Sequence, residues 1–254
     1  MRLHLHEWGE PGAPRVVCLH GVQAHGGRFR RLAEERLEGF HVFAPDLRGH
    51  GRSGWEEPWT LQAHLDDLLE TFPDPAAWIG HSFGGRLVLE LAAGRPELVE
   101  RAALLDPAIV FPADYTRLLA EQELASDIAF ASPEAAIDAA VGDFPTTSRE
   151  IIEEEVQAHL EHHDDGRWRW RYSREAVAAG FVEVGKQPPS FERLRAPTLV
   201  VAGVDSKFVS VGEADLFRRA LGDRFELAVV PGGHRVLWDA FEETAEAVER
   251  FLTS

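Results

Sequence analysis

Short aliphatic runs that alternate with helical patterns constrain the fold of this chain most strongly. Seven such runs are predicted to be strands: Arg2–Glu7, Arg15–Leu19, His41–Ala44, Ala76–Ile79, Ala102–Leu105, Thr198–Ala202 and Phe225–Val230. Helical patterns lie between or after them, at Phe29–Glu38, Trp59–Thr71, Phe83–Ala93, Gly212–Leu221 and Val236–Leu252. This alternation predicts an α/β fold, with a mostly parallel central sheet of about seven strands and helices on both faces.

The alternation stops between Ile109 and Pro189. Three helical patterns follow one another there with no strand between them, at Tyr115–Leu124, Pro133–Val141 and Arg149–His162. Proline marks both ends of this stretch, and proline cannot continue a helix. We therefore expect residues 1–108 and 190–254 to form the core domain and residues 109–189 to form an inserted helical cap.

Composition excludes several classes of partner. The chain carries 43 acidic and 26 basic residues, a formal charge of −17, which repels phosphate backbones and anionic membranes. No apolar run approaches the ~18 residues of a membrane span, and the N-terminus lacks the apolar stretch of a signal peptide. We expect no nucleic-acid or membrane partner and a cytoplasmic location, while oligomeric state is not specified.

The segment Gly80-His81-Ser82-Phe83-Gly84 lies between a predicted strand and a predicted helix. A side chain at the apex of such a sharp turn needs neighbours that are almost free of side-chain atoms, and Gly80 and Gly84 meet that need. A serine hydroxyl is a weak nucleophile until a base takes its proton. Ser82 is thus the candidate nucleophile, and the rest of the chain should supply its base.

His234 has the best position among the twelve histidines to act as that base. It lies in a glycine-rich loop after the last predicted strand, so its side chain would reach the same carboxyl edge of the sheet as Ser82. Asp205 follows the strand Thr198–Ala202 and is predicted to orient His234, which gives the chain order Ser, Asp, His. Asp106, at the end of Ala102–Leu105, is the alternative acid.

These motifs resemble the α/β-hydrolase superfamily over nearly the whole chain, as an esterase or lipase-like serine hydrolase with a helical cap. The matching segments are His20-Gly21, Asp46-Leu47-Arg48-Gly49-His50-Gly51-Arg52-Ser53, the turn at Ser82, Val201-Ala202-Gly203-Val204-Asp205 and Pro231-Gly232-Gly233-His234. The resemblance implies that the backbone N–H groups of Val22 and Phe83 form the oxyanion hole. It also implies a cap near residues 109–189 and no cofactor.

Four further residues are candidates for the substrate pocket. Gln23 and His25 follow His20-Gly21, and Trp168 and Trp170 belong to the aromatic set of the cap. Histidines and aspartates at 159–165 have spacings that can bind a metal, but they lie at a polar helix end before Gly166. We therefore predict no metal site.

The predicted residues favour hydrolysis of carboxylic esters of small to medium apolar substrates through an acyl-enzyme. The resemblance leaves other reactions of the same residues open: those of lactonases, thioesterases, amidases, C–C bond hydrolases, perhydrolases and acyltransferases. A serine at this turn argues against dehalogenases and epoxide hydrolases of the superfamily, which use aspartate there. A ligand-binding or sensor protein with weak turnover is the alternative from another class.

Overall fold

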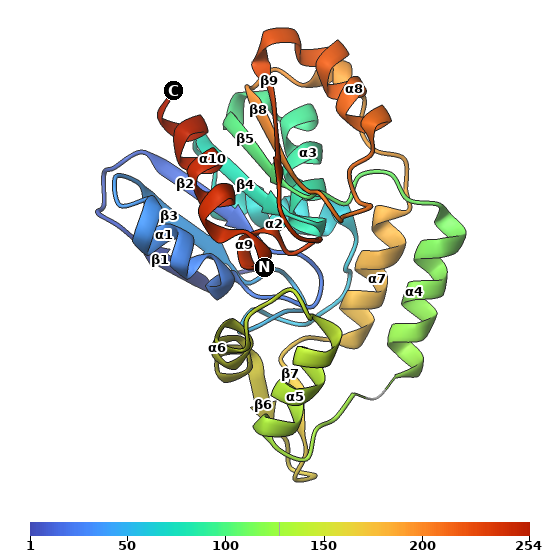
Figure 1. The fold of residues 1–254 in the computed structure, drawn as a ribbon. Coiled ribbons are helices and arrows are strands. Elements are labelled where there is room, and N and C mark those ends of the chain that lie inside the picture. Colours follow the sequence, from blue (N-terminus) through green and yellow to red (C-terminus); the bar gives the residue numbers. More distant parts are fainter. Residues whose placement is uncertain (127) are drawn as a thin grey trace.

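The computed structural model describes residues 1–126 and 128–254 and has a central seven-stranded sheet (Figure 1). The strand order is β1-β3-β2-β4-β5-β8-β9, with β1 antiparallel to β3 and the other neighbours parallel. The strands are β1 Leu5–Trp8, β2 Arg15–Leu19, β3 His41–Pro45, β4 Ala76–His81, β5 Val99–Leu105, β8 Thr198–Gly203 and β9 Phe225–Val230. The predicted fold class is confirmed, and the first strand begins later than the predicted Arg2.

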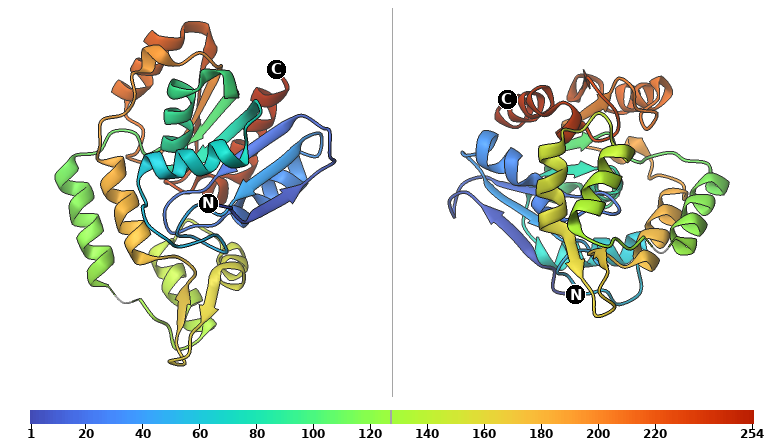
Figure 2. Two further views of the ribbon diagram at one scale, coloured as in Figure 1. Left: turned by 180° about the vertical axis from the view of Figure 1, so that it is seen from behind. Right: turned by 60° about the horizontal axis from the view of Figure 1, so that its bottom comes forward.

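Alternate residues of the strands point to opposite faces, as the period of a strand requires. Val17 and Leu19 pack against the helices α2 Leu61–Thr71, α3 Phe83–Gly94 and α8 Val211–Leu221. Val16 and Cys18 pack on the other face, against α1 Arg30–Arg36, α9 Val236–Asp239 and α10 Phe241–Thr253. The view from behind shows α2, α3 and α8 on the near side of the sheet (Figure 2). Four short 3-10 turns complete the core: η1 Gly26–Phe29, η2 Pro96–Leu98, η3 Phe191–Arg193 and η4 Gly222–Arg224.

The predicted single helix Val236–Leu252 is wrong, because the chain breaks at Ala240 between α9 and α10. Ala240 has φ −146° and ψ 63°, which are not helical angles. The carboxylate of Asp239, just before the break, accepts hydrogen bonds from Gly233 N–H, Thr146 and Thr147. These tertiary contacts hold the short α9 against the loop that carries His234.

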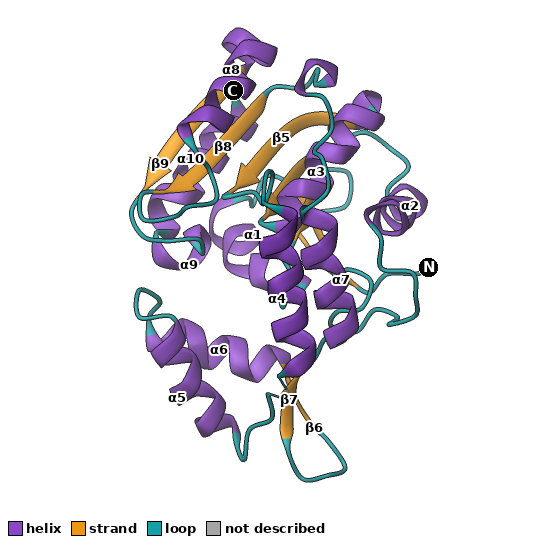
Figure 3. Cartoon of the chain, turned by 90° about the vertical axis from the view of Figure 1, so that its right-hand side faces the viewer, coloured by secondary structure: helices purple, strands orange, loops and turns teal. Residues whose placement is uncertain are grey.

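Residues of the predicted cap lie below the sheet in Figure 1 and form two helix pairs. Helix α4 Ala113–Ala125 packs against α7 Arg174–Val184, and α5 Pro133–Asp143 packs against α6 Arg149–His159. The expectation of a stretch without strands is wrong, since β6 Leu160–His162 and β7 Trp168–Trp170 form an antiparallel hairpin beside α5 and α6 (Figure 3). Helix α7 has no counterpart in the predicted set.

The guanidinium of Arg86 joins this helical region to the core. Its side chain on α3 is fully buried and forms an ion pair with Glu90. It also donates to the carbonyl oxygens of Ile109 at 3.0 Å, Lys186 at 3.2 Å and Gln187 at 2.8 Å. The Arg86 side chain therefore binds the chain on both sides of the helical region, at residue 109 and at residues 186–187.

Among the described residues, no helix is both long and apolar enough to cross a bilayer.

Replacing Arg86 by Met should destabilise the protein strongly. Several buried carbonyl groups would lose their donor, so we expect the free energy of unfolding to fall by roughly 3 kcal/mol or more. Urea denaturation measures this change. Arg219→Met, at an exposed position of α8, is the control and should change it by less than about 0.5 kcal/mol. An effect of Arg86→Met as small as that of the control would contradict the assigned role.

Candidate active site

The backbone at Ser82 has a conformation that non-glycine residues rarely adopt. Ser82 lies between β4 and α3 with φ 55° and ψ −116°. A Cβ atom at Gly80 would lie 2.4 Å from the oxygen of Gly84, and one at Gly84 would lie 2.1 Å from the oxygen of Leu19. Both positions therefore have to be glycine, and the sharp turn presents the Ser82 side chain at the carboxyl edge of the sheet.

The backbone of Gly21 and Val22 passes close to Ser82. A Cβ atom at Gly21 would lie 3.0 Å from the Cβ atom of Ser82 and 3.4 Å from its Oγ atom. Val22 and Phe83, the expected oxyanion donors, line the same cavity as Ser82. The structure brings these predicted residues together at one site.

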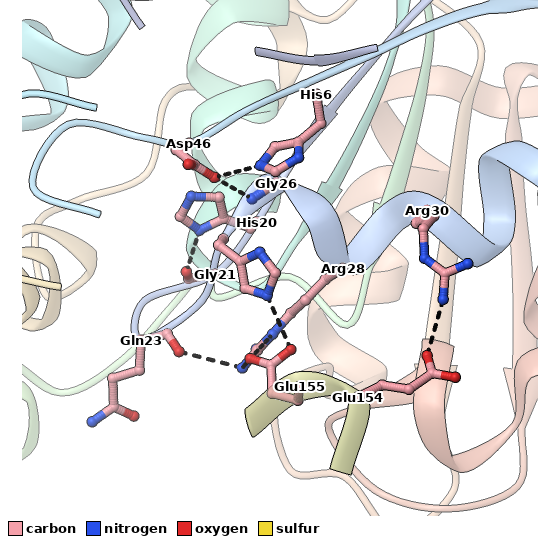
Figure 4. Close-up of polar contacts among 11 residues, drawn as sticks. His6, His20, Gly21, Gln23, Gly26, Arg28, Arg30, Asp46, Glu154 and Glu155 are labelled. Atoms are coloured by element: carbon pink, nitrogen blue, oxygen red, sulfur yellow. Dashed lines mark hydrogen bonds and ion pairs between the residues drawn. The ribbon is translucent and has the colours of Figure 1, made fainter. Parts of the chain in front are cut away.

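His20 supports the loop that contains Val22 (Figure 4). Its Nε2 atom accepts a hydrogen bond from the N–H of Leu47 at 2.9 Å, so its Nδ1 atom carries the proton and donates to the oxygen of Gly21 at 2.7 Å. Burial holds the pKa of His20 well below its usual value, which keeps the ring in this neutral form. Asp46 fixes the far end of the loop by accepting from the N–H of Gly26 at 2.8 Å.

His234 is held by Asp106. The Nδ1–H group of His234 donates to Oδ2 of Asp106 at 2.6 Å, which leaves Nε2 unprotonated. The Asp106 side chain is completely buried, whereas that of His234 is 28% exposed. Oδ2 of Asp106 also accepts a hydrogen bond from the hydroxyl of Ser206 at 2.5 Å. This arrangement can orient a general base.

The prediction that Asp205 orients His234 is wrong, and the alternative Asp106 occupies that position. Asp205 lies in an exposed turn beyond β8, and its N–H group donates to the oxygen of Gly232. Ser206, the next residue in that turn, is the one whose side chain points to Asp106. Asp106 directly follows β5, and its φ of 43° directs the carboxylate under His234.

Two aromatic side chains enclose the ring of His234. The ring of Phe208 stacks on it with centroids 3.6 Å apart, and His81 donates from Nε2 to the oxygen of His234 at 2.9 Å. Burial lowers the pKa of His234 to about 3 and raises the pKa of Asp106 to about 6. Among the described residues, no hydrogen bond joins Ser82 to His234, and such contacts often form only when substrate is bound.

Ser82 and His234 line a cavity of about 360 Å³. Its wall is mostly apolar and is made by residues at the sheet edge and by residues of the helical region at 111–184; it includes Val22, Phe83, Phe111, Leu119, Phe181 and Phe208. An adjoining cavity of about 190 Å³ has several residues in common with it. The site can therefore enclose a small organic molecule beside the serine.

The four predicted pocket residues differ in position. Gln23 lines the cavity of Ser82, and its amide donates to Glu123 of α4 at 2.7 Å. Trp170 lines the adjoining cavity, whereas Trp168 packs on the small apolar cluster of α5 and α6 and lies tilted against His162, with ring centroids 4.9 Å apart. The prediction for Trp168 is therefore not supported by its contacts.

His25 is a further correction, because its side chain faces helix α6 and lines neither of these cavities. Its Nε2 atom lies 3.1 Å from Glu155, and its ring stacks on His159 at 4.6 Å. Arg28 donates to the same carboxylate at 2.8 Å (Figure 4). These half-buried polar contacts join the segment after β2 to α6 beside the site.

Sequence reasoning missed the two arginines of the cavity wall, Arg28 and Arg235. Arg235 is the residue after His234, so its position in the chain was the available signal. In the described part of the chain, one group of metal-ligating atoms converges, from His4, His6 and Asp46. Both oxygens of Asp46 already accept backbone N–H groups, from Gly26 and Arg52, so this carboxylate has a structural role.

Comparison with known proteins identifies the family. The family described as alpha/beta hydrolase fold matches residues 14–241. The chain belongs to the α/β-hydrolase family. This α/β-hydrolase is 35% identical to Lipase LipV of Mycobacterium tuberculosis over 243 residues, which cover 92% of this chain and 91% of the lipase. It is 29% identical to Esterase Rv0045c of the same organism, over 96% of this chain and 84% of the esterase.

Solved structures agree with this assignment. The crystal structure of E-2-(acetamidomethylene)succinate hydrolase has a TM-score of 0.87 and 25% identity to this α/β-hydrolase, covering 99% of this chain and 95% of the other. A thioesterase domain from the curacin biosynthetic pathway has a TM-score of 0.80 at 22% identity, covering 98% of this chain and 94% of the domain. The second likeness shows the fold alone.

Separate replacement of Asp106 and Asp205 by Asn tests the corrected assignment. An amide at Asp106 would stabilise the wrong tautomer of His234, so we expect kcat/KM for an ester to fall by about 10⁴-fold. Asp205→Asn is the matched control and should stay within about twofold, because Asp205 is exposed. Steady-state kinetics on both variants measure the losses. A larger loss of kcat/KM in Asp205→Asn than in Asp106→Asn would contradict the assignment of Asp106.

Proposed function

We propose that this α/β-hydrolase cleaves carboxylic esters of small to medium apolar substrates through an acyl-enzyme on Ser82, with His234 as base and Asp106 as its orienting acid. The hydrogen bond from His234 to buried Asp106, at the edge that also presents Ser82, carries this proposal. Relatives named lipase and esterase support ester hydrolysis as the reaction.

The first half-reaction transfers the acyl group to Ser82. His234 Nε2 takes the hydroxyl proton as Oγ attacks the ester carbonyl, and the oxyanion accepts from the N–H groups of Val22 and Phe83. The protonated His234 then gives its proton to the leaving alcohol as the C–O bond breaks. Asp106 stabilises the imidazolium that exists between these two transfers.

The second half-reaction releases the acid. Water loses a proton to His234 as it attacks the acyl-enzyme, and the same N–H groups of Val22 and Phe83 stabilise the second tetrahedral intermediate. Collapse returns the proton to Ser82 Oγ and frees the carboxylic acid. The apolar wall of the 360 Å³ cavity suits acyl or alcohol groups of moderate size.

Hydrolysis of short 4-nitrophenyl esters tests the proposal. Ser82→Ala should lower kcat by roughly 10⁶-fold, because the nucleophile is lost. Ser190→Ala, at an exposed position before η3, is the control and should keep wild-type activity. A fluorophosphonate should label the wild-type protein and not Ser82→Ala.

A panel of lactones and thioesters assayed beside the esters assigns the preferred acyl compound. Faster turnover of a lactone or thioester than of any ester would replace the proposed reaction with another on the same residues. A protein that binds these compounds without turnover and without labelling would instead be a ligand-binding protein.

The pH dependence of kcat/KM follows from the Asp106–His234 pair. Catalysis needs Asp106 ionised and His234 neutral, and burial raises the pKa of Asp106 to about 6. As the pH falls through about 6, the pair binds a proton and the base is lost. We therefore expect kcat/KM for an uncharged ester to be constant from pH 7 to 9 and to fall about tenfold per unit well below pH 6. Initial rates at constant ionic strength measure this profile, and a decline that begins near pH 8 would contradict it.

A further inference from the structure

Arg235 places a guanidinium in the wall of the cavity that holds Ser82 and His234. It follows His234 directly in the chain and also lines the adjoining cavity beside Trp170. An arginine has five N–H donors and stays charged at neutral pH. Arg235 is half-buried, so it loses part of its hydration and a partner would replace what is lost.

Among the described residues, the Arg235 guanidinium has no ion pair and no hydrogen bond. Its contacts are the faces of two aromatic rings, Phe144 with its centroid at 3.0 Å and Trp238 at 4.9 Å. These cation–π contacts hold the planar group in place but leave its N–H donors unused. Burial and the nearby charge of Arg28 lower its pKa to about 9, so it carries a positive charge at pH 7.

The second arginine of the wall, Arg28, has a carboxylate partner. Arg28 donates from Nε and Nη2 to Glu155, whose carboxylate also contacts His25. Arg28 and Glu155 therefore satisfy each other. In the described part of the chain, Arg235 is therefore the arginine of this wall whose N–H donors have no carboxylate partner.

The charges of nearby carboxylates favour the charged form of Arg235, but none of the described ones accepts a hydrogen bond from it. Oδ1 of Asp239 accepts from Thr146 and Thr147, and its Oδ2 accepts from the N–H of Gly233. Asp143 lines the same cavity at an exposed position and is not in an ion pair with Arg235 in the described structure. An anionic group of a bound molecule would accept hydrogen bonds from the unused N–H donors of Arg235.

We propose that Arg235 binds a carboxylate of the substrate, so that the preferred esters carry an anionic group remote from the scissile carbonyl. This inference rests on the proposed ester hydrolysis at Ser82 and changes the preferred substrate from a wholly apolar ester to one whose apolar chain ends in a carboxylate, such as a monoester of a dicarboxylic acid. The guanidinium fork matches a carboxylate with two parallel hydrogen bonds. The overall charge of −17 and the carboxylates of Asp143 and Asp239 in the same wall act against an anion, so the proposal rests on the unused donors of Arg235 and not on the net charge of the cavity.

Two chromogenic esters of similar length test the proposal, the 4-nitrophenyl monoester of adipic acid and 4-nitrophenyl heptanoate. The wild-type enzyme should have the higher kcat/KM on the adipate monoester. Arg235→Gln should lower kcat/KM on this ester by about 10- to 100-fold, mainly through KM, because a hydrogen-bonded charge pair is lost. The same variant should change kcat/KM on the heptanoate by less than about threefold.

Two further variants test whether the loss in Arg235→Gln comes from carboxylate binding or from a general change of the structure. Arg235→Lys keeps the charge without the fork and should show an intermediate loss on the adipate monoester only. Arg219→Gln, exposed on α8, should change neither substrate. Free adipate should inhibit hydrolysis of the heptanoate competitively in the wild type and at least about tenfold more weakly in Arg235→Gln.

The outcomes distinguish this inference from the proposed function. Hydrolysis of the heptanoate with no preference for the adipate monoester, or an equal loss on both esters in Arg235→Gln, would overturn the role of Arg235 alone. Failure to hydrolyse either ester would overturn the proposed function. In that case, calorimetric titration of adipate into the wild type and Arg235→Gln still tests the anion site, and equal or undetectable binding to both would overturn it.

Discussion

The positive φ at Ser82 is the constraint on which the arrangement of the site depends. The turn can form only because Gly80 and Gly84 bring the backbones of β4, α3 and β2 into direct contact. The oxygen of Ser82 accepts hydrogen bonds from the N–H groups of Arg86 and Ala108, so the strained residue is held from both sides. The same contacts place α3, and with it the fully buried Arg86, at the base of the helical region that covers the site.

Much of this arrangement could be predicted from the sequence because it depends on local rules. The glycines around Ser82, the strand before it and the helix after it each follow from short-range sterics and periodicity. The position of His234 follows from topology, since it comes after the last strand of a parallel sheet. The choice between Asp106 and Asp205 could not be made this way, because both follow neighbouring strands. It depends on the φ of 43° at Asp106 and on the turn that directs Ser206 inward.

The region over the site was harder to predict for a different physical reason. The hairpin strands at Leu160–His162 and Trp168–Trp170 are three residues each, too short for a periodic signal to stand out. No proline or glycine lies at the break at Ala240, so the sequence does not predict it. The break arises from contacts of Asp239 with distant residues. His25 follows Gly21 and Val22 in sequence, yet its ring turns to Glu155 on α6. In each case, tertiary contacts override the local pattern.

A crystal structure of the protein after reaction with a fluorophosphonate tests the central claim most directly. The account predicts phosphorus bonded to Ser82 Oγ, with its oxygen about 2.7–3.1 Å from the N–H groups of Val22 and Phe83. It also predicts that the Nδ1 atom of His234 keeps its hydrogen bond to Asp106, with Nε2 directed at the adduct. A phosphonyl group on another residue, or a His234 ring that bonds to Asp205, would contradict the account.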